Sequence, residues 1–185
     1  AVLFILALKG LSSPKTARRG NLLGAAGAAI ATAVVFFYGQ EYYGGPVKHL
    51  PQILIAIAIG SIIGWVAARR VQMTQMPQMV ALFNGVGGGA AAVISVIEFL
   101  AVESESIPIL TATIFTVVVG SVSFTGSLLT YAKLQELMTS RPVVIPLGRF
   151  ITIGVAVATV ATAVLLIVNP TNTLLWLLLG LSLVL

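Results

Sequence analysis

The chain of 185 residues is 58% hydrophobic and only 8% charged, and its mean hydropathy is +1.09. Because soluble domains carry about 25% charged residues, this composition excludes a water-soluble globular protein and predicts an all-α protein that crosses a membrane several times. Without cysteine the chain can form neither a disulfide nor a thiolate metal site, and a single histidine leaves little material for hydrolytic catalysis. The net charge of +5 does not indicate nucleic-acid binding, because the basic residues cluster at the ends of apolar segments.

A membrane-spanning helix needs about 20 mostly apolar residues. On this basis the sequence predicts a transmembrane helix bundle with about seven spans, the first of them short. Strands are not expected, because the strict apolar and polar alternation of a membrane barrel is missing. The fifth span is longer than a bilayer is thick, so its last turns are expected in solvent. The predicted spans cover residues 1–11, 21–38, 50–68, 77–100, 107–138, 147–168 and 172–185.

Lys and Arg are concentrated on alternate loops. The first, third and fifth loops hold all the basic residues except Lys48, whereas the second and fourth loops carry the acidic residues Glu41, Glu103 and Glu105. The positive-inside rule then predicts that the N-terminus lies outside and that the odd-numbered loops are cytoplasmic, or face the matrix. Lys133 and Glu136, expected on one helix, form together with Arg141 either a cytoplasmic docking surface or simply the positive-inside flank. The basic residues of the odd-numbered loops are Lys9, Lys15, Arg18, Arg19, Arg69, Arg70, Lys133, Arg141 and Arg149.

The second and third spans carry small residues at helical spacing. Such stripes let two helix backbones approach closely, and packing is the interpretation that we favour for both. Trp65, near the inner end of the third span, is the kind of residue that anchors a helix at the membrane interface. The stripes consist of Gly20, Gly24, Gly27, Ala28 and Ala31 in the second span, and of Gly60 and Gly64 in the third.

The fourth span follows a Met-Thr-Gln-Met-Pro turn and contains one strongly polar side chain, Asn84, in an otherwise apolar run. Pro77 suits the first turn of this helix, because proline has no N–H to leave unpaired. Small and polar residues spaced four, three, four and three apart share one face of the helix. A seam of this kind is expected to face protein or water. Its members are Asn84, Gly88, Ala91, Ser95 and Glu98.

The fifth span carries a second seam, in which hydroxyl residues and one glycine alternate at spacings of three and four. Two such seams facing each other could order a file of water across the bilayer. Asn84 cannot ionise, so it can position water or a proton carrier but cannot carry charge. Alternatively, the hydroxyls bond the carbonyl four residues earlier in their own helix, or help neighbouring helices pack. The seam consists of Thr113, Thr116, Gly120, Ser123, Ser127 and Thr130.

Three smaller features each have two interpretations. The stretch from Gly85 to Ala90 matches the G-x-G-x-x-A dinucleotide fingerprint, but it lies inside a hydrophobic helix with no strand before it. Glycines that admit a neighbouring helix or water are therefore the favoured interpretation. Glu98 is either an interface carboxylate that reaches water or a point of proton entry. His49 is expected to be a solvated loop residue.

The segments RRGNLLGAAGAAIA, VAARRVQMTQMPQMVALFNGVGGGAAA and SVSFTGSLLTYAKLQ span most of the chain. Together they resemble the membrane domain of the beta subunit of proton-translocating NAD(P) transhydrogenase. The resemblance implies that hydride passes between NAD(H) and NADP(H) in soluble domains, driven by protons that cross this membrane domain. The chain starts and ends inside apolar segments, so we expect a partial subunit that conducts protons and has no nucleotide or metal site of its own.

In the family's M-P-x-x-V-A-x-x-x pattern, many members carry histidine where this chain has Asn84. That histidine is assigned to proton transfer, which an amide cannot perform. The resemblance therefore implies that a protonatable group comes from another helix or subunit, or that water alone bridges the site. Ser127, in T-G-S, matches a serine that the family places along the same path. The implied proton path comprises Asn84, Ser127, Ser123, Ser95 and Glu98, and the implied cytoplasmic coupling surface comprises Arg69, Arg70, Lys133 and Arg141.

The resemblance also implies partners: the membrane helices and soluble NAD(H)-binding domain of an alpha subunit, the chain's own NADP(H)-binding domain, and a second protomer. The expected location is a bacterial inner membrane rather than the mitochondrial inner membrane. The competing class is an ion- or solute-coupled secondary transporter or a pore subunit, which inverted repeats with broken helices would favour. A purely structural scaffold would leave the seams of Asn84 and Ser127 unexplained. A Rossmann-type domain further along the chain would decide for transhydrogenase.

Overall fold

The computed structural model describes the backbone of residues 2–42, 49–101, 106–138 and 147–185, and the side chains in these ranges except those of 38–42. Their regular structure is entirely helical. Five helices are long and apolar enough to cross a membrane, and the two shorter ones, α1 and α7, are also apolar. The prediction of a multi-pass all-α protein is therefore confirmed. The elements are α1 (Val2–Leu11), α2 (Ala17–Tyr42), α3 (Leu50–Arg70), the 3-10 helix η1 (Met73–Gln75), α4 (Met76–Ala101), α5 (Ile107–Leu134), α6 (Gly148–Val168) and α7 (Asn172–Val184).

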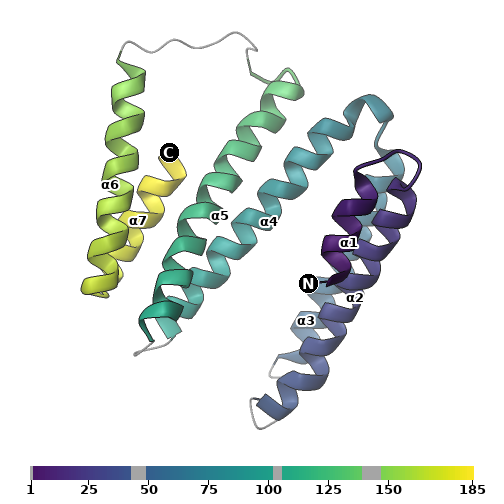
Figure 1. The fold of residues 1–185 in the computed structure, drawn as a ribbon, viewed down its shortest axis with the longest axis horizontal. Helices are drawn as coiled ribbons and strands as arrows, with labels where there is room; N and C mark the ends of the chain where they lie inside the picture. The colour runs from purple at the N-terminus through teal and green to yellow at the C-terminus, as the bar shows by residue number, and fades with distance from the viewer. Residues whose placement is uncertain (1, 43–48, 102–105, 139–146) are drawn as a thin grey trace. The chain divides into compact units, whose positions relative to one another are not determined.

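The chain divides into two compact units, residues 1–69 and 70–185. In the first unit, α1 folds back along α2 (Figure 1). Their backbones approach closely at glycine, since a Cβ atom built on Gly20 would lie 2.8 Å from the carbonyl oxygen of Ala7. Packing is thus confirmed as the role of the glycine stripe at this position. Around Gly60 and Gly64 of α3, by contrast, no described atom lies within 4 Å of a built Cβ.

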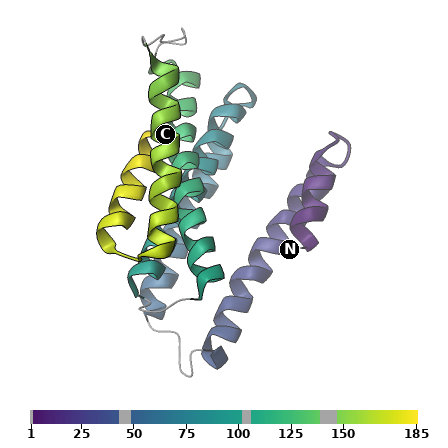
Figure 2. The same ribbon diagram turned by 60° about the vertical axis from the view of Figure 1, so that its left-hand side comes forward.

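In the second unit, α5 lies between α4 on one side and the pair α6 and α7 on the other (Figures 1 and 2). Helices α4 and α5 run antiparallel and side by side. The apolar core is built where α5, α6 and α7 meet, and Val96 of α4 joins it. The side chains with no exposed surface in this core are Val117, Leu166, Leu175 and Leu178.

The helix boundaries differ from the predicted spans mainly in α2 and α5. Helix α2 begins at Ala17, four residues earlier than predicted, so its first turn is basic. Helix α5 ends at Leu134, so the prediction of helix to residue 138 was wrong. The chain turns at Glu136, whose φ is 58°, and the N–H groups of the next two residues fold back to the carbonyl of Ala132. Lys133 and Glu136 therefore do not share a helix.

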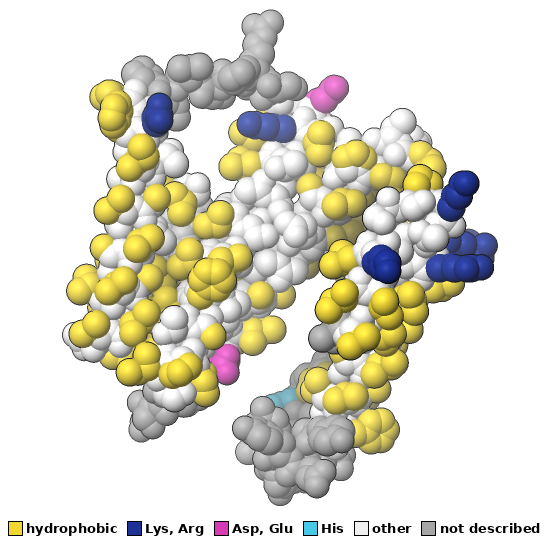
Figure 3. Space-filling model, in the orientation of Figure 1, with side chains coloured by type: hydrophobic (Ala, Val, Ile, Leu, Met, Phe, Trp, Pro, Cys, Tyr) yellow, Lys and Arg dark blue, Asp and Glu magenta, His cyan; other side chains and the backbone are white. Residues whose placement is uncertain are grey.

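Figure 3 shows hydrophobic side chains along the flanks of the helices and Lys and Arg side chains near helix ends, as expected for helices in a bilayer. Trp65 on α3 is exposed, and the guanidinium carbon of Arg69 lies 5.4 Å from its ring centroid. This contact places an aromatic and a cation together, as an interface anchor would. The predicted orientation in the membrane stays a prediction. Lys48, Glu103, Glu105 and Arg141 lie outside the described residues.

Candidate functional site

Helices α4 and α5 touch through glycine. A Cβ atom built on Gly120 of α5 would lie 2.5 Å from the carbonyl oxygen of Gly88, and one built on Gly88 would lie 2.8 Å from the Cβ of Ser123. One turn away, a Cβ on Gly85 would lie 2.9 Å from the Cβ of Ser127. Cβ contacts below 3.0 Å essentially do not occur in proteins, so only glycine allows this approach. The hypothesis that these glycines admit a neighbouring helix is confirmed.

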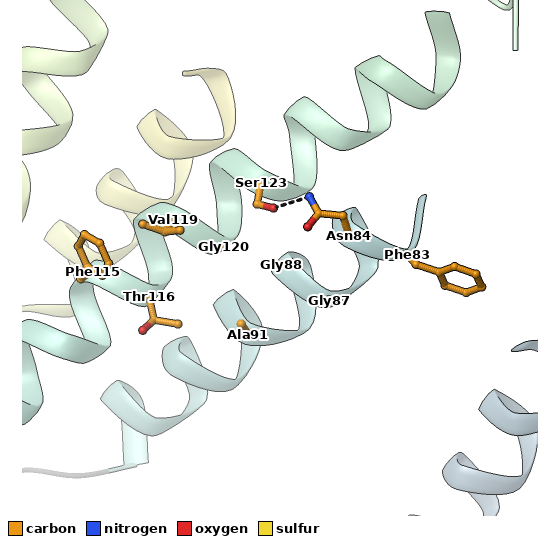
Figure 4. A pocket seen from close by; sticks show the side chains of 10 residues that line it. All are labelled: Phe83, Asn84, Gly87, Gly88, Ala91, Phe115, Thr116, Val119, Gly120 and Ser123. Atoms are coloured by element: carbon orange, nitrogen blue, oxygen red, sulfur yellow. Dashed lines mark hydrogen bonds between the residues drawn. The ribbon is translucent and has the colours of Figure 1, made fainter. Parts of the chain in front are cut away.

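Asn84 joins the two helices at the edge of this glycine contact. Its amide nitrogen donates to the Oγ atom of Ser127 at 2.8 Å and to the Oγ atom of Ser123 at 3.1 Å. Figure 4 shows the amide nitrogen turned toward Ser123 and the amide oxygen turned away from it. Because both serines act as acceptors, their hydroxyl protons remain available to a further group. The sequence predicted that Asn84 faces the hydroxyl seam of α5, and in the structure Asn84 bonds two serines of that seam.

Seven other hydroxyls of the second unit behave differently. Threonines and one serine donate to the carbonyl four residues earlier in their own helix, as is common in membrane helices. This includes Thr116 and Thr130, two members of the predicted seam, so for them the alternative interpretation holds. The self-bonded residues are Thr111, Thr116, Thr125, Thr130, Thr159, Thr162 and Ser182.

An open cavity of about 410 Å³ lies between α4 and α5 beside the Asn84 side chain (Figure 4). Asn84 and Ser123 contribute polar groups at one end of its lining, and Thr116 contributes one further along α5. The cavity is large enough for several water molecules, and its polar groups give water the partners it needs. Its lining consists of Phe83, Asn84, Gly87, Gly88, Ala91, Phe115, Thr116, Val119, Gly120 and Ser123.

Only part of the predicted seam of α4 belongs to the face that contacts α5, since Gly88 meets Ser123 while Glu98 is exposed. The residues of α4 that are buried are Gly85, Ala92, Ser95 and Val96. This face is rotated from the predicted one, because close approach favours the small side chains of Gly85 and Ala92. Asn84 lies at the edge of the contact with much of its side chain exposed, and Glu98 is exposed.

The remaining predicted site residues are not gathered at Asn84. Ser95 is buried, with 6% of its surface exposed, and Arg69, Arg70 and Lys133 are exposed. The sequence analysis missed Gln78, whose Nε2 atom donates to the carbonyl oxygen of Leu134 at 3.1 Å. An antiparallel register that pairs residue 84 with 127 also pairs residue 78 with the end of α5. Gln78 could have been found from that register.

Comparison with known proteins decides the family. The sequence model of the family described as NAD(P) transhydrogenase beta subunit matches residues 1–185. The chain belongs to the NAD(P) transhydrogenase beta subunit family. Two curated relatives, the NAD(P) transhydrogenase subunit beta of Rhodospirillum rubrum and that of a named strain of the species, are each 38% identical over 154 residues. The match covers 79% of this chain but 32% of each relative, so the chain spans about a third of the length of those transhydrogenase subunits.

Membership of the NAD(P) transhydrogenase beta subunit family and the five helices long and apolar enough to cross a membrane together support a membrane component of a transhydrogenase. The resemblance drawn from the M-T-Q-M-P and S-F-T-G-S segments is thereby confirmed.

Proposed function

We propose that this chain conducts protons through the membrane and couples their movement to hydride transfer between NAD(H) and NADP(H). The observation that carries the proposal is the cluster of Asn84, Ser123 and Ser127. Whereas seven other hydroxyls of this unit bond their own helix, these three side chains bond across two helices, and Asn84 and Ser123 line an open cavity. Polar groups inside an apolar membrane-spanning helix are costly in hydrocarbon and often mark ion or proton pathways.

The geometry suits a proton path more than an anion site. With its nitrogen donating to both serines, Asn84 has an amide oxygen that accepts no hydrogen bond from the described residues and can accept one from a ligand. The serine hydroxyls can accept from Asn84 and donate onward, so the cluster can relay hydrogen bonds to water in the cavity. A cationic or neutral donor, such as hydronium or water, fits an acceptor oxygen.

A titrating group has to come from outside the described part of the chain. Asn84 does not ionise, and Glu98 lies fourteen residues away on the same helix, about 21 Å at 1.5 Å per residue. His49 is exposed, before the start of α3. We therefore propose that a histidine or carboxylate on a partner helix reaches the open side of Asn84, with Asn84 and Ser127 holding water to it. Ser95 and Glu98 belong to the outer part of this proposed path.

The same proposal covers the partners and the location. Membrane helices and an NAD(H)-binding domain of an alpha subunit, an NADP(H)-binding domain of the longer beta subunit and a second protomer would complete the complex, in a bacterial inner membrane. The nucleotides would bind in those soluble domains and not in this chain. Arg69, Arg70, Lys133 and Arg141 would face the soluble domains. The helices α4 and α5 are continuous through the polar cluster, unlike the broken helices typical of secondary transporter sites.

Substitution of Asn84 tests the proposal. In the complete complex reconstituted into vesicles, Asn84→Leu should lower proton-coupled hydride transfer about tenfold or more, because leucine removes both cross-helix hydrogen bonds and dries the cavity. Asn84→His should retain part of the rate, since it restores a residue type that can transfer protons. Val80→Leu, on an exposed residue of the same helix that does not line the cavity, is the control and should leave the rate unchanged. The measured quantities are nucleotide reduction and the pH inside the vesicles; pumping at the wild-type rate by Asn84→Leu would refute the site.

A further inference from the structure

The C-terminus of α5 is capped by a side chain of α4. The last four carbonyls of a helix have no partner within the helix and must be satisfied elsewhere. In α5 the carbonyl of Tyr131 accepts from the N–H of Gln135, and that of Ala132 accepts from the N–H groups of Leu137 and Met138. The carbonyl of Lys133 accepts from the N–H of Glu136.

Only the fourth carbonyl, that of Leu134, is satisfied across helices. It accepts from the Nε2 atom of Gln78 at 3.1 Å. The Oε1 atom of Gln78 is buried and has no hydrogen-bond partner among the described residues. Among the described residues, Gln78 therefore bonds through its Nε2 donor and not through its Oε1 acceptor.

Gln78 and Asn84 make two cross-links between the same pair of helices. On α4 they are six residues apart, about 9 Å along the axis, and on α5 their acceptors at Leu134 and Ser127 are seven residues apart, about 10.5 Å. The antiparallel helices thus carry one cross-link beside the cavity and a second near their ends. Two links at different heights resist both sliding and pivoting, which one link cannot do.

The glycine contact lies beyond Asn84, on the side away from Gln78. Gly85 and Gly88 bring the backbones together there, and the atoms that meet them are the Cβ atoms of the small residues Ser127 and Ser123. In most helix pairs, ridges of side chains in grooves fix the axial register. Small residues form shallow ridges, so the hydrogen bonds at Gln78 and Asn84 add to the forces that set the register here.

We propose that Gln78 is a positioning residue: by capping α5 it holds α4 and α5 in the register that brings Asn84 to Ser123 and Ser127. The functional part of this inference rests on the proposed proton path. Gln78 does not touch the cavity, because it is absent from the residues that line it. Its effect on the rate is transmitted by the position of α5.

Two substitutions distinguish the effect of the hydrogen-bond donor of Gln78 from the effect of the rest of its side chain. Gln78→Met has a similar length but no donor, so it leaves the carbonyl of Leu134 without its partner. Gln78→Lys restores a donor, and a cation is favourable at a helix C-terminus, while the buried oxygen is lost. Gln52→Met, at an exposed position of α3, is the control. It makes the same replacement of glutamine by methionine at a site away from the contact between α4 and α5.

The first measurement reports register without relying on activity. This chain contains no cysteine, so spin labels can be attached to Cys introduced at Thr74 and Leu137, in a complex freed of other reactive cysteines. Both positions are exposed and lie at the η1–α4 and α5 ends. In the complete complex, Gln78→Met should shift or broaden the distance distribution between the labels, and Gln78→Lys should restore it.

The second measurement is proton-coupled hydride transfer in vesicles. Gln78→Met should lower the rate about two- to tenfold, the range that a net hydrogen-bond contribution of 0.5–1.5 kcal/mol gives, and Gln78→Lys should recover most of it. An unchanged distance and rate in Gln78→Met, or failure of Gln78→Lys to recover the rate, would overturn the proposal. Should Asn84→Leu also keep its full rate, the proposed function fails, while the label distance still tests the role of Gln78.

Discussion

Replacing Gly120 with alanine tests the glycine contact that supports the polar cluster. The new Cβ atom would lie 2.5 Å from the carbonyl oxygen of Gly88 and 3.0 Å from the Cβ of Ala92. Carbon–oxygen contacts in proteins are ordinarily about 3.3–3.6 Å, so the new atom is roughly 1 Å too close. The opposing oxygen belongs to a helix backbone, which cannot rotate away. Helices α4 and α5 must separate.

The magnitude follows from a comparison with Gly126, also on α5, where a built Cβ meets no described atom within 4 Å. Alanine at either position gains about 1 kcal/mol of helix stability relative to glycine, so this gain cancels between the two variants. Overpacking a close contact costs about 1–3 kcal/mol. Gly120→Ala should therefore be about 1–3 kcal/mol less stable than Gly126→Ala.

The assay is denaturant unfolding of the purified subunit in mild detergent, with the two variants compared under the same conditions. Because Ser123 and Ser127, which accept from Asn84, lie about one and two turns from Gly120 on the same helix, Gly120→Ala should also reduce proton-coupled transfer in the complex. Equal unfolding free energies for Gly120→Ala and Gly126→Ala would show that the two helices do not meet through Gly120, and the reasoning would fail.

Two further predictions concern the core and the topology. Leu178→Ala should lower the free energy of unfolding by about 2–5 kcal/mol, because Leu178 has no exposed surface, whereas Leu177→Ala, at 50% exposed, should cost less than 1 kcal/mol; similar losses would contradict the packing of α7. Cysteines placed singly at Ser13 and Ser104 should label from opposite sides of sealed vesicles, since the basic loops alternate. Labelling of both from one side would refute the predicted topology.

The spans were predictable because length and hydropathy dominate in a membrane protein. Helices α3, α4, α6 and α7 lie within two residues of the predicted boundaries. The end of α5 was missed because Leu137 and Met138 are apolar and extend the hydrophobic run. The structure ends the helix earlier through the left-handed conformation of Glu136, and composition carries no sign of that turn.

The candidate site was predictable in part. Asn84 and the serines of α5 stood out because polar side chains are rare in such helices. Which hydroxyls face a partner could not be read from spacing: Thr116 and Ser123 belong to one seam, yet only Ser123 bonds across to α4. The exact contact face of α4 depends on which small residue meets α5, and Gly85 and Ala92 outweigh the polar periodicity there.

The two faces of α5 differ in the conformational entropy that their packing requires. Toward α4 the contact is made by Gly85, Gly88 and Gly120, which have no side-chain rotamers to lose. Toward α7 it is made by leucines such as Leu175 and Leu178, each of which gives up about 0.5–1 kcal/mol of rotamer freedom on burial. At its glycine contact with α4, helix α5 thus packs without loss of side-chain rotamers, while its contact with α7 has to offset that loss through the burial of apolar surface.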